Sequence, residues 1–122
     1  MDRQQLGRDA ESRAATLLEQ AGLRVMVRNY RCRTGELDVV ASDGRVLVVA
    51  EVRMRSNQQY GGAAASITWR KRQRIVRATR HLLATQPALA GLPVRFDVLI
   101  AGSARSPLQW IRGAFDAGPG YL

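Results

Sequence analysis

Cysteine is almost absent from this sequence, and so are long apolar runs. The single cysteine, Cys32, excludes a disulfide within the chain and is typical of proteins in a reducing compartment. No apolar run approaches the roughly 20 residues that a membrane-spanning helix needs. Residues 1–5 are polar and lead into a helical pattern without the apolar core of a signal peptide. We therefore expect a cytoplasmic protein that does not enter membranes.

Acidic residues are also scarce. Ten acidic residues stand against nineteen basic ones, which leaves a formal net charge of +9. Such a surplus favours a polyanionic partner, with nucleic acid ahead of an anionic membrane surface. All the basic residues except Lys71 are arginines. Codon bias in a GC-rich genome would explain the choice of arginine over lysine, but it would not explain the net charge.

The pattern of apolar residues predicts one domain, residues 1–122, built from helices and strands. Its 46% hydrophobic and 24% charged residues are the balance of an ordinary globular protein. Helical spacing predicts helices over residues 4–21 and 69–84, and Ser66 or Thr68 can cap the second helix. The expected strands cover residues 23–30, 36–41, 45–52, 94–101 and 108–115. A polar connection containing Cys32 is expected at residues 31–34, and a loop at residues 56–65.

The third expected strand decides the architecture. Residues 46–50 are apolar on both faces, which is typical of a strand that is covered on both sides. We therefore predict an α/β sandwich in which this strand lies at the centre of a mixed sheet with a helix on each side. The order of elements is α-β-β-β-α-β-β.

A tight hairpin is expected between the second and third strands. If Asp43-Gly44 forms a two-residue turn, Ser42 faces Arg45 across the hairpin. The same register places Glu51 opposite Glu36. Acidic side chains from both strands should therefore meet at the open end of the hairpin.

Asp38 and Arg53 join this cluster because strand side chains repeat every two residues on one face. Asp38 lies diagonal to Glu51, and Arg53 follows Glu51 by two residues. Three neighbouring carboxylates repel one another unless a positive charge sits among them, and Mg²⁺ prefers such oxygen ligands. The alternative is a group of solvated strand-end residues that are partly neutralised by Arg53 and Arg55. The buried appearance of the neighbouring strand and the positive net charge bring the metal interpretation level with this alternative.

The second helix carries most of the local positive charge. No acidic residue occurs between residues 58 and 92, whereas six basic residues avoid the apolar stripe of Ile75 and Leu82: Arg70, Lys71, Arg72, Arg74, Arg77 and Arg80. We favour a helix that tracks phosphates over a merely solvated face. Trp69 could stack on a base, although a Trp at a helix start more often packs on the sheet. His81 has no partner at metal-ligand spacing and is expected to be structural.

At these residues the chain resembles the YraN-like bacterial proteins. The shared motifs are Gly7-Arg8-Asp9-Ala10-Glu11, Arg28-Asn29-Tyr30-Arg31, Gly35-Glu36-Leu37-Asp38, Glu51-Val52-Arg53-Met54-Arg55, Tyr60-Gly61, Lys71-Arg72-Gln73 and Arg95-Phe96-Asp97-Val98. They span residues 6–100, and their joint order is specific although each motif alone is weak. That family looks like a member of the PD-(D/E)XK (restriction-endonuclease-like) nuclease superfamily and is similar to archaeal Holliday-junction resolvases.

The resemblance implies roles for particular residues. It assigns Asp38 and Glu51 as catalytic metal ligands for Mg²⁺ or Mn²⁺, with Glu11 as an additional metal carboxylate and Glu36 as a supporting residue. The lysine of the superfamily signature falls on Arg53, which is a departure. Because arginine stays charged, Arg53 could stabilise transition-state charge but could not act as a general base.

The resulting expectation is a metal-dependent endonuclease that hydrolyses DNA phosphodiester bonds, with branched DNA as a candidate substrate. The residues expected to contact nucleic acid are Arg55, Lys71, Arg72, Gln73, Arg74 and Arg77. Two alternatives remain open. One is a nucleic-acid-binding module whose nuclease site is weak or inactive, which Arg53 favours, and the other is a protein-interaction or membrane-surface domain. Superfamily enzymes are often dimeric, which leaves a homodimer open for this chain.

Overall fold

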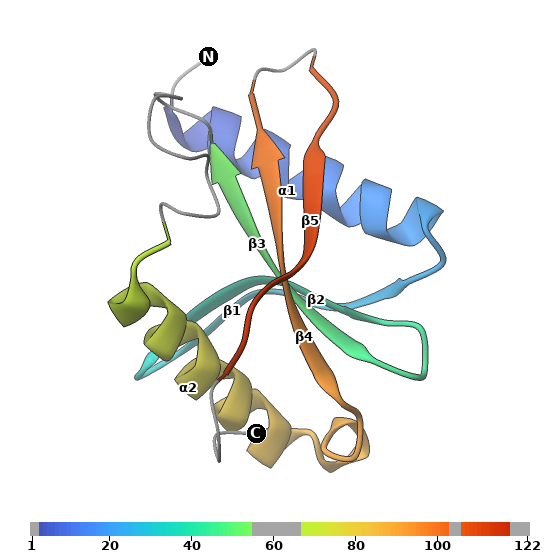
Figure 1. Cartoon of the computed structure of the whole chain (residues 1–122), viewed down its shortest axis with the longest axis vertical. Coiled ribbons are helices and arrows are strands. Elements are labelled where there is room, and N and C mark those ends of the chain that lie inside the picture. The colour runs from blue at the N-terminus through green and yellow to red at the C-terminus, as the bar shows by residue number, and fades with distance from the viewer. Residues whose placement is uncertain (1–2, 55–66, 103–105, 118–122) are drawn as a thin grey trace.

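A computed structural model describes residues 3–54, 67–102 and 106–117 of the protein. The elements follow the order α-β-β-β-α-β-β, with a short 3-10 turn before the fourth strand (Figure 1). They are α1 (Arg3–Gln20), β1 (Arg24–Cys32), β2 (Gly35–Ser42), β3 (Leu47–Met54), α2 (Trp69–Thr85), η2 (Pro87–Leu89), β4 (Val94–Ala101) and β5 (Gln109–Phe115). The predicted α/β fold is thus confirmed.

The five strands form one mixed sheet with β3 at its centre. Their spatial order is β1-β2-β3-β4-β5, in which β3 and β4 are parallel and the other neighbours are antiparallel. A parallel pair needs a crossover connection, and α2 lies within the connection between β3 and β4. The central position predicted for the apolar run at residues 46–50 is therefore confirmed, although Val46 itself precedes the strand.

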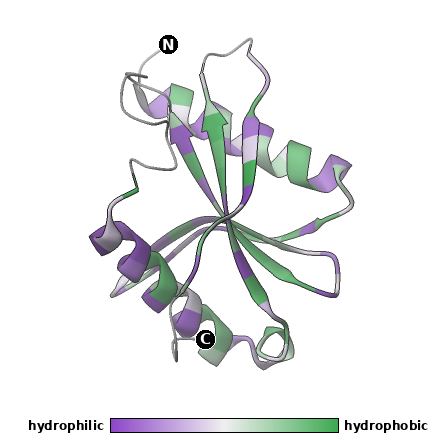
Figure 2. Ribbon diagram, in the orientation of Figure 1, coloured by the Kyte–Doolittle hydropathy of each residue, from purple (hydrophilic) through white to green (hydrophobic). Residues whose placement is uncertain are grey.

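Each face of the sheet is covered by one helix (Figure 1). Leu47 and Val49 of β3 pack in a core cluster with residues of α2, whereas Val48 and Ala50 pack with residues of α1. All four side chains are completely buried. Figure 2 shows the consequence: the central strands are largely hydrophobic, and both helices carry hydrophilic patches. No helix in the described ranges is both long and apolar enough to cross a bilayer.

The turn between β2 and β3 differs from the prediction. Ser42 pairs with Leu47 rather than with Arg45, so that four residues, not two, connect the strands. The Asp43 carboxylate accepts the backbone N–H groups of Arg45 at 2.8 Å and Val46 at 3.1 Å. These side-chain hydrogen bonds close a longer turn than the Asp-Gly pair suggests. The predicted pairing of Glu36 with Glu51 is wrong for this reason.

The first hairpin also differs from the prediction. β1 continues to Cys32, which pairs with Gly35, so only Arg33 and Thr34 remain as the turn. Cys32 is therefore a strand residue and not part of a four-residue connection.

The loop expected at residues 56–65 lies outside the described residues. Thr68, one of the two residues predicted to cap the second helix, is the N-cap of α2. Its side chain accepts a hydrogen bond from the Lys71 N–H at 3.1 Å.

Asp97 joins the edge strand β5 to β4 through a buried carboxylate. Arg95 donates two hydrogen bonds to this carboxylate, and the Trp110 indole and the Gly113 backbone each donate one, all at 2.9 Å. Because Asp97 is fully buried, these four donors replace the water that its charge would otherwise need. This network gives Asp97 a structural role.

Candidate functional site

Asp38 and Glu51, here called the carboxylate pair, meet where the ladder between β2 and β3 ends. The last paired residues of that ladder are Val39 and Ala50. Beyond them, side chains replace the backbone hydrogen bonds. The Val52 N–H donates to Asp38 Oδ2 at 2.9 Å, and the Asp38 N–H lies 3.4 Å from Glu51 Oε2. The pair thus bridges two strands that no longer bond to each other directly.

A local departure from strand alternation lies beside Asp38. Leu37 and Val40 pack in the same core cluster, although strict alternation would place them on opposite faces. On β1, Asn29 has a positive φ of 53°, which Asn tolerates better than most residues. Beside these irregularities the Asp38 side chain reaches β3, where it accepts the Val52 N–H.

Burial dominates the electrostatics of the carboxylate pair. Glu51 is only 2% exposed, and burial together with the charge of Asp38 raises its pKa from 4.5 to about 8. Burial also raises the pKa of Asp38, against the opposing effect of the Val52 hydrogen bond. A hydrogen bond between the two carboxyl groups lowers the pKa of Asp38 and raises that of Glu51. Both effects favour retention of a proton by the pair, and the rise in pKa is resolved most strongly for Glu51.

Lys71 brings a positive charge to this pair from the first turn of α2. Its Nζ lies 4.0 Å from Glu51 Oε1, and its side chain is 41% exposed. The charge of Lys71 opposes the rise in pKa of both carboxyl groups. Lys71 is thus within reach both of the buried carboxylates and of a ligand in solvent.

Glu11 approaches the site from α1. Burial raises its pKa, and the charge of Asp38 adds to that rise, whereas Arg28 and a hydrogen bond with Asn29 oppose it. Within residues 3–54, 67–102 and 106–117, however, no three His, Cys, Asp or Glu residues are gathered closely enough to hold a metal ion. The role of Glu11 as a further metal ligand stays a prediction.

The other predicted strand residues lie around the pair rather than in it. Glu36 forms an ion pair with Arg31 across the first hairpin, 3.2 Å from carboxylate oxygen to Nε, and is 56% exposed. Its charge still contributes to raising the pKa of Asp38. Arg53 is half-buried on β3, two residues after Glu51, and its backbone pairs with Ile100. Arg55 lies outside the described residues.

The basic residues of α2 divide into two groups. Arg72 contacts the protein itself, because its Nε donates to the Ile67 carbonyl at 3.1 Å and its guanidinium lies 5.4 Å from the centre of the Phe115 ring. Arg74 and Arg77 are exposed, and Gln73 is half-buried. Arg74 and Arg77 are therefore better placed than Arg72 to contact a ligand.

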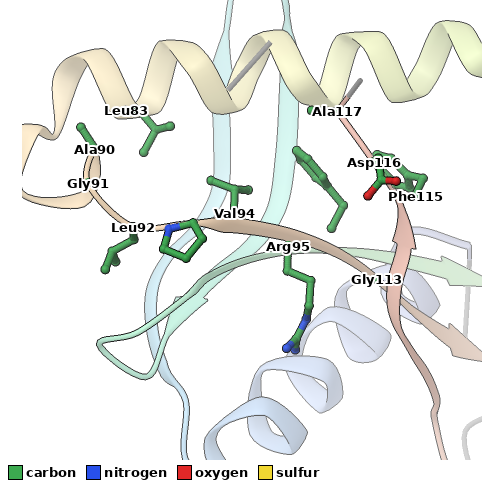
Figure 3. Close-up of a pocket in the computed structure, with 12 residues that line it drawn as sticks. Leu83, Ala90, Gly91, Leu92, Val94, Arg95, Gly113, Phe115, Asp116 and Ala117 are labelled. Atoms are coloured by element: carbon green, nitrogen blue, oxygen red, sulfur yellow. The ribbon is translucent and has the colours of Figure 1, made fainter. Parts of the chain in front are cut away.

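A cavity of about 830 Å³ lies away from the carboxylate pair. It is formed between the C-terminal half of α2 and the beginning of β4, and Leu83, Leu92, Val94 and Phe115 supply much of its apolar wall (Figure 3). Figure 3 shows the Arg95 side chain turned away from α2, and its guanidinium group donates hydrogen bonds to Asp97. None of the predicted site residues lines this cavity.

Comparison with known proteins assigns the chain to a family. Residues 10–101 match the family described as "Uncharacterised protein family UPF0102". The chain belongs to the UPF0102 family. A UPF0102 protein of Xanthomonas oryzae pv. oryzae is 52% identical over 115 residues, which cover 94% of each chain. UPF0102 proteins of Nitrosomonas europaea and Legionella pneumophila are 48% and 41% identical, over 90% and 94% of this chain and 92% and 98% of theirs. The resemblance to the YraN-like proteins is therefore confirmed as membership of this family.

Two features of this UPF0102 chain were not predicted from its sequence. Lys71 was expected near the site as a phosphate contact, but its approach to Glu51 depends on how α2 packs on the sheet. The Asp97 network was also missed. Arg95 and Asp97 stand two residues apart on one strand, so they share a face, and this spacing was the available signal.

Proposed function

We propose that this protein binds nucleic acid and acts as a metal-dependent endonuclease on DNA, as a member of the PD-(D/E)XK nuclease superfamily. The observation that carries the proposal is the carboxylate pair, in which Glu51 is buried and Asp38 half-buried, with the partly exposed Lys71 beside it. Hydrolysis of a phosphodiester needs compensation for phosphate charge and an activated water, and this group of residues can support both. Branched DNA is the substrate class that the similarity to Holliday-junction resolvases suggests.

The chemistry of the pair fits a hard divalent cation such as Mg²⁺ or Mn²⁺. Asp38 and Glu51 offer carboxylate oxygens, and burial together with the charge of Asp38 raises the pKa of Glu51, which a cation beside it would oppose. Mg²⁺ is commonly held by one or two carboxylates, with waters and substrate phosphate oxygens completing its shell. A site with two protein carboxylates is therefore sufficient. A bound cation would lower the pKa of a water and neutralise charge on the phosphate.

The cationic side chains have separate tasks in this proposal. Lys71, 4.0 Å from Glu51 Oε1, can pair with a phosphate oxygen beside the carboxylates. Arg53 would stabilise negative charge that develops during cleavage, because a guanidinium does not accept a proton at neutral pH. Arg74 and Arg77 would hold the phosphate backbone further along α2 without reading sequence.

A binding module with weak or no catalysis is the second candidate. It is favoured by Arg53, which stands where the superfamily signature has a lysine that can exchange protons. The exposed basic residues of α2 would serve such a module equally well. Only a cleavage assay separates the two candidates.

The test uses labelled linear, flapped and four-way DNA with Mg²⁺, with Mn²⁺ and with a chelator. We expect cleavage that requires the metal and that is lost in Asp38→Asn but retained in Glu19→Gln. Glu19 is a control because it is an exposed acid near the C-terminal end of α1, to which no role in the site is assigned. Metal-independent binding of every DNA without any cleavage would replace the nuclease proposal by the binding module. The absence of both binding and cleavage would reject both candidates.

A further inference from the structure

Trp69 is the most exposed large hydrophobic residue that the structure describes. Its exposed fraction is 73%, against 40% for Met26 and for Met54. A Trp at the start of a helix usually packs on the sheet. The indole of Trp69 does not, because most of it is exposed. A single exposed hydrophobic residue is not unusual by itself, so its surroundings decide what it means.

The residues that follow Trp69 are cationic, and one of them, Lys71, lies beside the carboxylate pair. Successive residues of a helix are rotated by about 100°, so Trp69 and Lys71 lie on opposite flanks of the first turn of α2. Arg70 lies between them on the solvent side and is exposed. Across the N-terminal end of α2 the order is thus Lys71, Arg70, Trp69. A helix is roughly 10 Å wide with its side chains, a width that a few nucleotides of single strand can cross.

We propose that Trp69 is a stacking platform for an unpaired base of the substrate. A single strand would cross the N-terminal end of α2, with its phosphates at Lys71 and Arg70 and a base on the indole of Trp69. Exposed aromatic rings beside basic residues bind single strands because every base has a face that can stack. A base inside a blunt duplex is already stacked on both sides and cannot use this platform. The inference rests on the proposed function and narrows the substrate to nucleic acid with a single-stranded part.

The experiment measures binding in a chelator, so that cleavage does not interfere. Anisotropy titration of fluorophore-labelled DNA compares the affinities of an oligo-dT single strand, a flapped duplex and a blunt duplex for wild type, Trp69→Ala and Trp69→Phe, and the tryptophan fluorescence of the wild type is followed in parallel. Met26→Ala is the control for loss of an exposed apolar side chain elsewhere. Trp69→Phe supplies the background signal of Trp110, the other tryptophan of the chain, whose N–H is bonded to Asp97 and whose ring centre lies 4.0 Å from the Arg112 guanidinium. Far-ultraviolet circular dichroism checks that each variant is folded.

We expect single-stranded and flapped DNA to quench the Trp69 fluorescence of the wild type. Trp69→Ala should weaken binding of these two ligands by about 10-fold or more, the effect of losing one stacked base, and should leave the blunt duplex unchanged. Trp69→Phe should retain most of the affinity, and Met26→Ala all of it. If Trp69→Ala changes the affinity for all three ligands equally, or for none, the stacking proposal is overturned while DNA binding stands. If the wild type binds no nucleic acid at all, the proposed function itself is rejected, and the stacking proposal is rejected with it.

Discussion

Replacing Glu51 by Gln should stabilise the protein at alkaline pH. The Glu51 carboxyl is buried and keeps its proton in the folded state up to a pKa of about 8, whereas the ordinary value is 4.5. Between these values the folded state binds a proton that the unfolded state has lost. The free energy of unfolding must therefore fall as pH rises through this window and level off above it. Gln resembles the protonated acid in shape and cannot ionise. The free energy of unfolding of the variant should therefore not fall in this pH window.

The expected magnitude follows from the two pKa values. Each pH unit within the window contributes about 1.4 kcal/mol, so wild type should lose up to about 5 kcal/mol between pH 4.5 and pH 8. At pH 5 the two proteins should be almost equally stable. At pH 9 Glu51→Gln should be more stable by several kcal/mol, which is a large part of the total stability of a small domain.

Urea unfolding followed by circular dichroism, in a chelator and at pH 5 to 9, measures this difference. Glu19→Gln is the control, because Glu19 is an exposed residue near the C-terminal end of α1, and its curve should follow that of the wild type. Adding Mn²⁺ at pH 8 should stabilise wild type by binding to the folded state and should leave Glu51→Gln unchanged. Parallel stability curves for wild type and Glu51→Gln would refute the reasoning, because Glu51 could then not carry a proton that burial retains.

Three further predictions concern binding and cleavage. Asp38→Asn keeps an acceptor for the Val52 N–H, yet it should abolish Mn²⁺ binding in calorimetry; an affinity equal to that of wild type would remove Asp38 from the metal site. Arg74→Glu with Arg77→Glu should weaken DNA binding strongly and flatten its dependence on salt, and unchanged affinity would leave this face merely solvated. Arg53→Ala should slow cleavage on the order of 100-fold with an unchanged pH–rate profile, whereas Arg53→Lys should keep much of the rate; a changed profile would contradict a purely electrostatic role.

The fold was predictable because its signals are local and agree with one another. Helical spacing, the two-faced apolar run at residues 46–50 and the Thr68 cap all identify elements that the structure contains. The hairpin register was missed because side-chain hydrogen bonds of Asp43 lengthen the turn. The error shifts the pairing by two residues, and side chains repeat every two residues. It therefore left Asp38 and Glu51 on one face, where a shift by one would have separated them.

The candidate site was less predictable because part of it depends on packing. No spacing in the sequence relates Lys71 to Glu51, twenty residues earlier and on another element. Their contact arises because α2 covers the face of the sheet to which Glu51 belongs. The contacts of Arg72 within the protein depend on packing in the same way, since Ile67 and Phe115 lie beside its guanidinium.

The sheet contains two buried acids, and their different surroundings bear on function. Asp97 receives four hydrogen bonds at 2.9 Å, two of them from a guanidinium, so its charge is compensated within the fold. Glu51 is as deeply buried, yet its contacts are the Asp38 carboxyl, the Asp38 N–H at 3.4 Å and Lys71 at 4.0 Å. A buried carboxyl with so little compensation costs stability, and such sites concentrate where chemistry is done. The contrast within one sheet supports the proposal that Glu51 binds a ligand, whereas the four hydrogen bonds of Asp97 stabilise the fold.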